Sequence, residues 1–183
     1  MTIRTTHRWR QKAVLAACLA AALWIAAPLG ASVVELMDLE ALVSGSDSIV
    51  EGVVEGVTSR WEEDRIYTYA TVRIDDPLKG DRTRTLTIRQ LGGQVGSLVA
   101  IVPGMPQFEA GDQAILFLKG AGNGTYYVVG MNQGRYLIND NVAVSNLTGV
   151  DLVDAKTGAP RGTSSVRRVE VERLKAQIRE LLR

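Results

Sequence analysis

The chain has 183 residues, with 21 basic and 20 acidic side chains, which gives a net charge of +1 at neutral pH. This balance gives no electrostatic case for binding nucleic acid or an anionic membrane surface. The chain holds one cysteine, Cys18, and one histidine, His7, so thiol and imidazole chemistry can involve only these two positions.

The start of the chain has the pattern of a secretory signal peptide. Residues 1–12 contain four basic side chains and no acid, and residues 13–34 carry no charge. Small residues, including Gly30 and Ser32, end the apolar stretch. This pattern predicts an export signal over residues 1–32 and a secreted or periplasmic protein. The alternative is an uncleaved membrane anchor, because about 20 apolar residues suffice to span a bilayer.

Removal of residues 1–32 would leave residues 33–183, a length that fits one domain. Four basic residues and no acid leave with the signal, so 17 basic and 20 acidic residues remain, a net charge of −3. Cys18 and His7 also leave, which excludes cysteine nucleophiles, histidine-containing triads and thiolate metal sites. We therefore predict a domain with no catalytic residues, no metal, no cofactor and no affinity for nucleic acid.

The remaining sequence consists mostly of short apolar or alternating stretches between turn residues, which predicts a mainly β protein, a barrel or a sandwich. The expected strands are residues 49–59, 66–75, 84–91, 114–118, 125–131 and 135–138. A short amphipathic helix is expected over residues 35–43 and an amphipathic C-terminal helix over residues 170–182. Residues 92–96 are expected to form a flexible loop before an apolar stretch at 97–102, and residues 139–165 a long surface loop.

Glycine, proline and polar residues in the segment 49–77 predict where the first strands bend, turn and end. The glycines Gly52 and Gly56 in strand 49–59 indicate sharp coiling, as small barrels require. The polar residues 60–65 are expected to form a hairpin loop, and Pro77 is expected to end the following strand.

Strand 66–75 alternates cleanly, with even-numbered residues expected to face the core and odd-numbered residues to face outward. The outward face of this strand and the next combines tyrosine, threonine and arginine. Aromatic rings offer rigid contact area and arginine offers a planar fork of donors, a combination that favours partner binding. The same residue types also suit any exposed strand. The candidate binding residues are Trp61, Tyr67, Tyr69, Arg73 and Arg89.

The surviving enzyme hypothesis is a hydrolase that uses carboxylates in the region 61–76. Such chemistry needs two carboxylates that face each other. The acids of this region are adjacent in sequence, and neighbouring residues on a strand point to opposite faces. The lysines, including Lys175 in the terminal helix, are not expected to be buried beside a serine, so a serine–lysine dyad is not predicted.

Three segments resemble a group of uncharacterised secreted bacterial proteins that are often encoded near matrixin-type metalloproteases. They are residues 46–54 (SDSIVEGVV), residues 67–72 (YTYATV) leading to Leu78-Lys79-Gly80, and residues 108–118 (FEAGDQAILFL). Their order is similar to the netrin-like module of tissue inhibitors of metalloproteinases. This resemblance implies an OB-like barrel, closed or partly open, and a metalloprotease as a candidate partner. Those inhibitors use an amino-terminal cysteine and disulfides, whereas residues 33–183 contain no cysteine.

Together these observations predict a single OB-like domain over residues 33–183 that acts as an exported, non-catalytic binding module. Its partner is expected to be a protein, either a secreted metalloprotease or a cell-surface component. The alternatives are the carboxylate-dependent hydrolase and an envelope structural protein held by an uncleaved N-terminal helix, which would be its only contact with the membrane.

Overall fold

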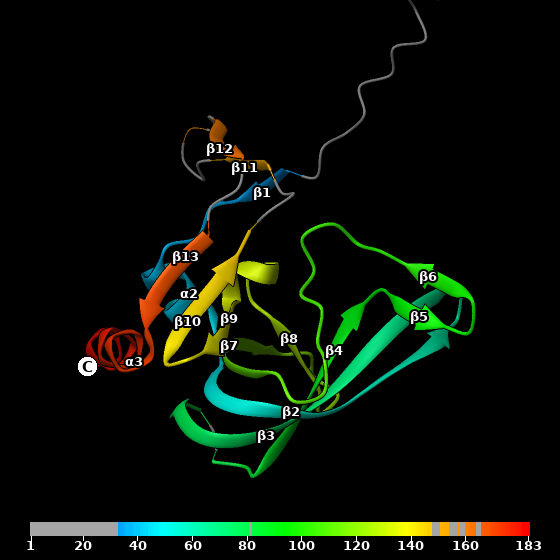
Figure 1. Ribbon diagram of the computed structural model, residues 1–183, viewed down its shortest axis with the longest axis horizontal. Coiled ribbons are helices and arrows are strands. Elements are labelled where there is room, and N and C mark those ends of the chain that lie inside the picture. The colour runs from blue at the N-terminus through cyan, green and yellow to red at the C-terminus, as the bar shows by residue number, and fades with distance from the viewer. Residues whose placement is uncertain (1–32, 81, 148–150, 154–156, 158–159, 164–165) are drawn as a thin grey trace, which may run out of the picture. The chain divides into compact units, whose positions relative to one another are not determined.

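Strands dominate the computed structural model, which describes residues 33–183 apart from 81, 148–150, 154–156, 158–159 and 164–165. The predicted leader, residues 1–32, lies outside the described residues. The chain is mainly β, with a short helix near the start of the described part and a second helix at its end, as the sequence predicts (Figure 1). None of the helices in these described ranges combines the length and the apolar character of a membrane-spanning helix.

The strands are β1 (Val33–Glu35), β2 (Ser48–Glu62), β3 (Arg65–Lys79), β4 (Thr85–Leu91), β5 (Gly93–Val95), β6 (Leu98–Ala100), β7 (Gln113–Gly120), β8 (Tyr126–Val128), β9 (Arg135–Asn139), β10 (Val142–Asn146), β11 (Asp151–Val153), β12 (Pro160–Thr163) and β13 (Val166–Glu170). The helices are α2 (Leu39–Gly45) and α3 (Val171–Leu181), and a 3₁₀ turn, η1, covers Met131–Gly134.

Five strands form a ring. β2, β3 and β4 follow one another as antiparallel neighbours, and β7 pairs antiparallel with both β2 and β8. β8 and β4 complete the ring through a single parallel pair, Ile88 with Tyr126. The ring is therefore partly closed and not a complete barrel, and its weakest closure is the seam between β4 and β8. Beyond β7 the sheet continues through β9, β10 and β13.

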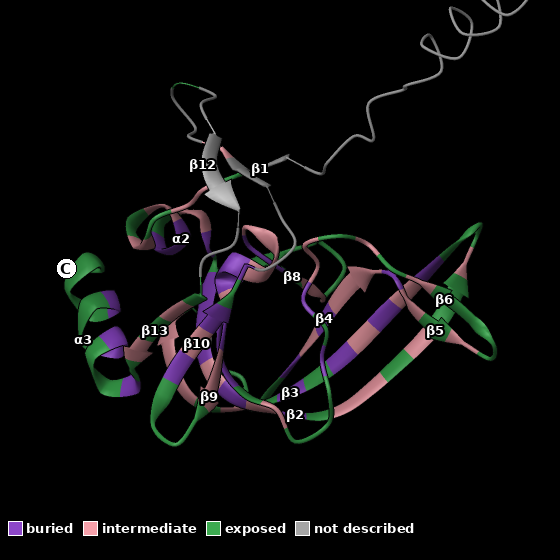
Figure 2. Cartoon of the chain, turned by 45° about the horizontal axis from the view of Figure 1, so that its top comes forward, coloured by how far each residue is buried: buried purple, intermediate pink, exposed green. Residues whose placement is uncertain are grey.

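The start of β2 and the middle of β7 are buried on both faces. Val50 of β2 points into the apolar core inside the ring, whereas its neighbour Ile49 points into a second core. Phe117 of β7 joins this second core with Ile178 of α3. Figure 2 shows α3 with its buried side in purple and its opposite side exposed. Residues 114–118, predicted as a central strand from their uniform apolarity, are all buried.

The alternation predicted for strand 66–75 is confirmed. The even-numbered residues from Ile66 to Val72 are buried, and the odd-numbered residues are half-buried or exposed. Gly52 allows β2 to approach β3 closely, because a Cβ at this position would lie 2.3 Å from the carbonyl oxygen of Arg73. Irregular register between β2 and β3 adds β-bulges, which increase the coiling of the pair.

The hairpin between β2 and β3 is tighter than predicted. Residues 60–65 do not form a loop, since β2 extends to Glu62 and β3 begins at Arg65. Only two residues connect the strands, and Glu63 in this turn has a positive φ of 54°. The polar composition of the segment suggested a loop, but its side chains pair across the strands, as described below.

The prediction that Pro77 ends the second strand is also wrong. β3 continues through Pro77 to Lys79 and still pairs with β2 there. Its pairing with β4 stops at Arg73. One edge of β3 is therefore free at Pro77, and a proline without an N–H is tolerated on such an edge.

Two other segments predicted as loops contain strands. Residues 92–96 include β5, which pairs with β6 in the apolar stretch 97–102, and residues 139–165 include β10, β11 and β12. β10 pairs with both β9 and β13. Ser145 in β10 is fully buried and donates a hydrogen bond to the carbonyl of Asn132 at 3.1 Å. Backbone pairing, this satisfied serine and the core residue Ala143 place the segment in the sheet.

The first helix begins later than the expected residues 35–43. Asp38 caps α2, because its carboxylate accepts a hydrogen bond from the backbone N–H three residues further on, at 2.8 Å. At the other end, Lys79 Nζ donates to the carbonyls of Val43 at 2.8 Å and Ser46 at 2.6 Å. These bonds satisfy carbonyl groups that a helix end leaves unpaired, and they attach α2 to the end of β3.

A buried lysine, which the sequence did not indicate, holds α3 against the ring. Lys175 Nζ lies 2.8 Å from Glu51 Oε2 on β2 and 2.6 Å from Asp76 Oδ2 on β3. Burial lowers the pKa of Lys175, but the hydrogen bonds and charges of Asp76 and Glu51 outweigh this and raise that pKa above its ordinary value. Arg179, one turn later, adds a second contact to Asp76 at 3.1 Å. The helix is thus fixed by charge on one side and by its apolar stripe on the other.

Replacing Lys175 with methionine keeps the packing of the aliphatic stem but leaves Glu51 and Asp76 without their central cation. We expect the free energy of unfolding to fall by about 2–3 kcal/mol, because the two carboxylates then remain partly buried without the ammonium group that compensates their charge. Urea unfolding at pH 7 measures this change. Arg173→Met, on the exposed side of the same helix, is the control and is expected to change stability by less than about 0.5 kcal/mol. Equal stability of the two variants would contradict the role given to Lys175.

Candidate functional site

Three of the predicted binding residues meet on the outer face of β3 and β4. Tyr69 lies directly opposite Arg89 in the β3–β4 register, and Tyr67 lies two residues earlier on the same face. The guanidinium carbon of Arg89 lies 3.6 Å from the centre of the Tyr67 ring. These three side chains therefore form a contiguous group.

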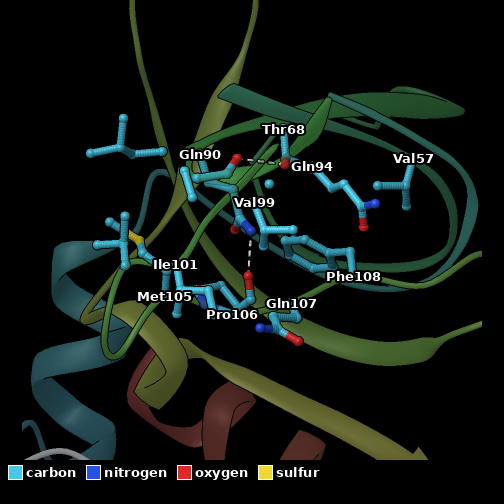
Figure 3. Close-up of a pocket in the computed structure, with 15 residues that line it drawn as sticks. Val57, Thr68, Gln90, Gln94, Val99, Ile101, Met105, Pro106, Gln107 and Phe108 are labelled. Atoms are coloured by element: carbon cyan, nitrogen blue, oxygen red, sulfur yellow. Dashed lines mark hydrogen bonds between the residues drawn. The ribbon is translucent and has the colours of Figure 1, made fainter. Parts of the chain in front are cut away.

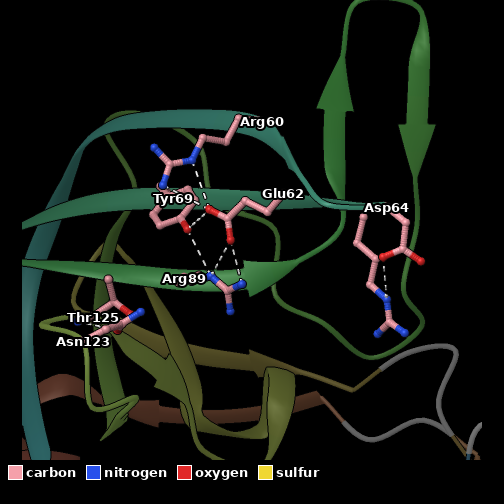
Figure 4. A network of polar contacts seen from close by, with 8 residues as sticks. Arg60, Glu62, Asp64, Tyr69, Arg89, Asn123 and Thr125 are labelled. Atoms are coloured by element: carbon pink, nitrogen blue, oxygen red, sulfur yellow. Dashed lines mark hydrogen bonds and ion pairs between the residues drawn. The ribbon is translucent and has the colours of Figure 1, made fainter.

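Glu62 at the end of β2 is the centre of this group. Its carboxylate accepts hydrogen bonds from Arg89 Nη2 at 2.7 Å, from Arg60 Nε at 3.1 Å, and from the Tyr69 hydroxyl (Figure 4). The Arg60 guanidinium also stacks over the Tyr69 ring at 4.2 Å. We call these five residues the Arg89 cluster: Arg60, Glu62, Tyr67, Tyr69 and Arg89.

Glu62 and Arg89, at the centre of the cluster, stabilise each other in their ionised forms. The Tyr69 hydroxyl and then the Arg89 guanidinium lower the pKa of Glu62 from 4.5 to about 2. The bond from Arg89 to Glu62 raises the pKa of Arg89 above its ordinary value, against the opposing effect of partial burial. Glu62 is therefore an ionised acceptor with its donors already in place, and at neutral pH it has no proton to give as a general acid.

The structure separates Trp61 and Arg73 from the Arg89 cluster. Trp61 lies opposite Ile66 in the β2–β3 register and so shares the inward side, not the outer face. Arg73 is on the outer face but six residues from Tyr67, a distance of roughly 20 Å along a strand. It pairs with Glu55 at 3.4 Å and with Asp75. The five candidate binding residues thus lie in three separate places: Tyr67, Tyr69 and Arg89 in the cluster, Arg73 farther along the outer face, and Trp61 on the inward side.

Trp61 instead belongs to an apolar end of the molecule. The start of β5 lies against the inward side of the β2–β3 hairpin, since a Cβ on Gly93 would lie 2.2 Å from Thr68 Oγ1 and 2.4 Å from Ser59 Oγ. Figure 1 shows the hairpin of β5 and β6 beside the far ends of β2 and β3. Four large apolar side chains at this end are exposed, and we call them the apolar tip: Trp61 (49%), Leu98 (58%), Val99 (58%) and Ile101 (75%).

Two cavities lie against β4. One, of about 290 Å³, lies on the side of the apolar tip (Figure 3), and the other, of about 250 Å³, lies beside Tyr67 and Arg89 of the cluster. Gln90, Leu91, Met105 and Pro106 line both of them. The second is also lined by Tyr127 and Val128 of β8, so it is the cavity at the seam between β4 and β8.

Sequence patterns missed Arg60 and Glu62 as site residues because the segment 60–65 was taken for a loop. The exposure of residues 98–101 was also not anticipated, since an apolar stretch is expected to be buried. The sequence alone did not indicate the face of Arg60 and Glu62. The register shift between Val54 and Gly56 moves the even-numbered residues of β2 from the inward side to the outer face, which brings these two residues beside Tyr67 and Tyr69.

The described residues include no group of three acidic, histidine or cysteine side chains placed to hold a metal ion. Four of the five acids of the region 61–76 pair with cations: Glu62 with Arg89, Asp64 with Arg65, Asp75 with Arg73 and Asp76 with Lys175. This end of the molecule therefore offers two surfaces: exposed apolar side chains on the inward side of the β2–β3 hairpin and an ion-paired cluster on its outer face. No protein-family model matches the chain, and no curated protein matches it in sequence.

We expect Tyr69→Phe to raise the pKa of Glu62 toward 4.5, because it removes the largest stabilising contact of the carboxylate. Carboxyl-carbon NMR titration measures the midpoint, which is expected at about 2 in the wild type. Tyr127→Phe, an exposed tyrosine outside the cluster, is the control and leaves the midpoint unchanged. A wild-type midpoint near 4.5 would contradict the geometry of the cluster.

The same shift fixes the pH range in which the cluster stabilises the fold. A carboxylate with a lowered folded pKa contributes stability above its unfolded pKa and loses it as the pH falls through the folded one. The contribution of Glu62 should therefore disappear between about pH 4.5 and pH 2. The stability difference between the wild type and Glu62→Gln, followed by urea unfolding, is expected to shrink across this interval and to stay constant from pH 5 to 7.

Proposed function

We propose that the chain is an exported, non-catalytic module that binds a protein partner through the apolar tip. The exposure of Trp61, Leu98, Val99 and Ile101 at one end of the molecule carries this proposal. The other large apolar side chains that are exposed among the described residues are spread over β8, β10, β13 and the end of α3. An apolar group gathered at one end marks an interaction site more often than scattered residues do.

The Arg89 cluster supplies the polar part of the proposed interface. Interfaces combine an apolar centre with a polar rim, and tryptophan, tyrosine and arginine contribute most to their affinity. The rings of Tyr67 and Tyr69 are held by stacked guanidinium groups, so little side-chain freedom is lost when a partner covers them. Of the residues predicted from sequence, Trp61, Tyr67, Tyr69 and Arg89 keep a place in this proposal, and Arg73 is peripheral.

The chemistry of the carboxylates supports a non-catalytic role. Hydrolysis by paired carboxylates needs one protonated acid at working pH, with its pKa raised. Glu62 has its pKa shifted in the opposite direction, to about 2. Its oxygens are also engaged by Tyr69, Arg60 and Arg89 and are not free for substrate.

The partner class follows from the predicted leader and from the family resemblance. An exported protein meets other secreted proteins or the cell surface, and the resemblance implies a matrixin-type metalloprotease. We propose that protease as the first partner to test, with a cell-surface component as the alternative. The mechanism would differ from that of the cysteine-dependent inhibitors, since residues 33–183 contain no cysteine.

Export with cleavage is tested by intact mass spectrometry of the protein from the culture medium and the periplasm. The expected mass is that of residues 33–183, which corresponds to loss of the predicted signal. A mass that still includes residues 1–32, together with recovery in the membrane fraction, would favour the anchored alternative.

The interface is tested by biolayer interferometry with the matrixin-type metalloprotease of the same organism. A double variant, Leu98→Ser with Ile101→Ser, is expected to weaken binding at least tenfold, because both side chains are central to the apolar tip and exposed in the free protein. The wild type and the double variant can also be immobilised and used to capture binding proteins from the culture medium, which extends the test to other partners.

The matched control is Leu182→Ser, which alters an exposed apolar residue at the far end of α3. It is expected to bind as the wild type does. Partner binding that is unchanged in the double variant, with both proteins folded by circular dichroism, would refute the apolar tip as the interface.

A further inference from the structure

The turn between β7 and β8 contains the one asparagine of the chain that is followed by glycine, in the dipeptide Asn123-Gly124. Both residues are exposed. Gly124 has a positive φ of 78°, and a Cβ at this position would lie more than 4 Å from every residue other than its chain neighbours. The backbone nitrogen of Gly124 is therefore unhindered, because the residue has no side chain and its surroundings are open.

The carboxamide of Asn123 is held in place by Thr125. Its oxygen, Oδ1, accepts hydrogen bonds from Thr125 N at 3.2 Å and from Thr125 Oγ1 at 2.6 Å (Figure 4). Because a backbone N–H can only donate, the atom that faces it is the carboxamide oxygen. Local bonds of this kind are typical of turns that contain asparagine. Both donors withdraw electron density from the carbonyl, which makes its carbon, Cγ, more open to attack by a nucleophile.

A carboxamide in this state, next to an unhindered backbone nitrogen, can react within the chain. The Gly124 nitrogen loses its proton and attacks Asn123 Cγ, so a new N–C bond closes a succinimide ring. The bond between Cγ and Nδ2 breaks, and Nδ2 leaves as ammonia with the proton that the Gly124 nitrogen released. Water then opens the ring at either carbonyl, which leaves aspartate or isoaspartate at position 123. The reaction uses water as its only co-reactant.

Thr125 is placed to assist the first step. When the nitrogen adds to Cγ, negative charge develops on Oδ1, the atom that both Thr125 groups already contact. Donors aimed at an oxygen that gains charge stabilise the transition state more than the ground state, as in an oxyanion hole. The turn therefore supplies a reactive pair of residues together with the donors that favour the reaction between them.

We propose that Asn123 is a modification site at which the chain converts its own asparagine into aspartate and isoaspartate, with Thr125 as the positioning residue. The site is close to a described surface, because its turn runs between Ala121 and Tyr127, which both line the cavity beside Arg89. The conversion adds one negative charge to this turn, and the isoaspartate product also lengthens its backbone.

The test incubates the purified protein in mildly alkaline buffer at physiological temperature and follows it by peptide mapping with mass spectrometry. We expect Asn123 to lose its amide before any other asparagine, and isoaspartate to form there together with aspartate. The rate should rise with pH, because the attacking nitrogen must lose a proton. Aspartate without isoaspartate would indicate direct hydrolysis of the side chain and would overturn the proposal. Faster conversion at another asparagine would do the same.

Thr125→Ala tests the positioning role. Alanine keeps the backbone N–H but lacks the hydroxyl, so we expect the conversion to slow about threefold to tenfold, the ratio that one hydrogen bond supplies. Thr125→Ser restores the hydroxyl and is expected to recover most of the wild-type rate. In concentrated urea the turn is lost, and there the three proteins should react at equal rates. Equal rates of wild type and Thr125→Ala in the folded state, or the same difference in urea, would refute this role.

Asn123→Gln is the control for the site itself. Glutamine keeps the carboxamide, but its longer side chain must close a larger ring, so we expect no conversion at this position over the same period. Conversion of this variant at the wild-type rate would contradict attack by the Gly124 nitrogen. None of these measurements involves a binding partner, so their outcome is separate from that of the proposed interface.

Discussion

The fold depends on the paired segments of β2 and β7, where neighbouring residues are buried in two different cores. One face closes the core inside the ring, and the other supports α2, α3 and the outer strands. Neighbouring residues such as Ile49 and Val50 therefore serve different cores, and neither can become polar without loss of packing. The charged contacts of Lys175 reach β2 and β3 from α3, so they join the helix to the same wall that the apolar residues form.

This arrangement explains which parts of the fold the sequence could predict. Regular alternation identified β3 and its two faces, and a uniform apolar run identified β7, because both patterns come directly from local burial. The prediction of a loop over residues 139–165 was wrong because the strands in this segment do not show such a burial pattern. β10 is held by backbone pairing on both edges, by the buried Ala143 and by the buried hydroxyl of Ser145, so its inward face carries one small and one polar side chain and shows no clear apolar period.

The candidate site was predictable only in part. Tyr67, Tyr69 and Arg89 were found because they alternate with core residues on recognisable strands. Glu62, the anion around which they are arranged, was assigned to a loop, since a run of charged residues resembles a turn when its cross-strand partners are unknown. The burial of Lys175 could not be predicted from the sequence either, because the carboxylates that pair with it, on β2 and β3, are about 100 or more positions away in the chain.

The incomplete closure of the ring leaves residues that serve two cavities at once. At the seam, β4 and β8 share one backbone pairing, and the Gln90 side chain donates to the Pro106 carbonyl. Gln90, Leu91, Met105 and Pro106 line both cavities, so a substitution at any of these four residues alters the walls of both together.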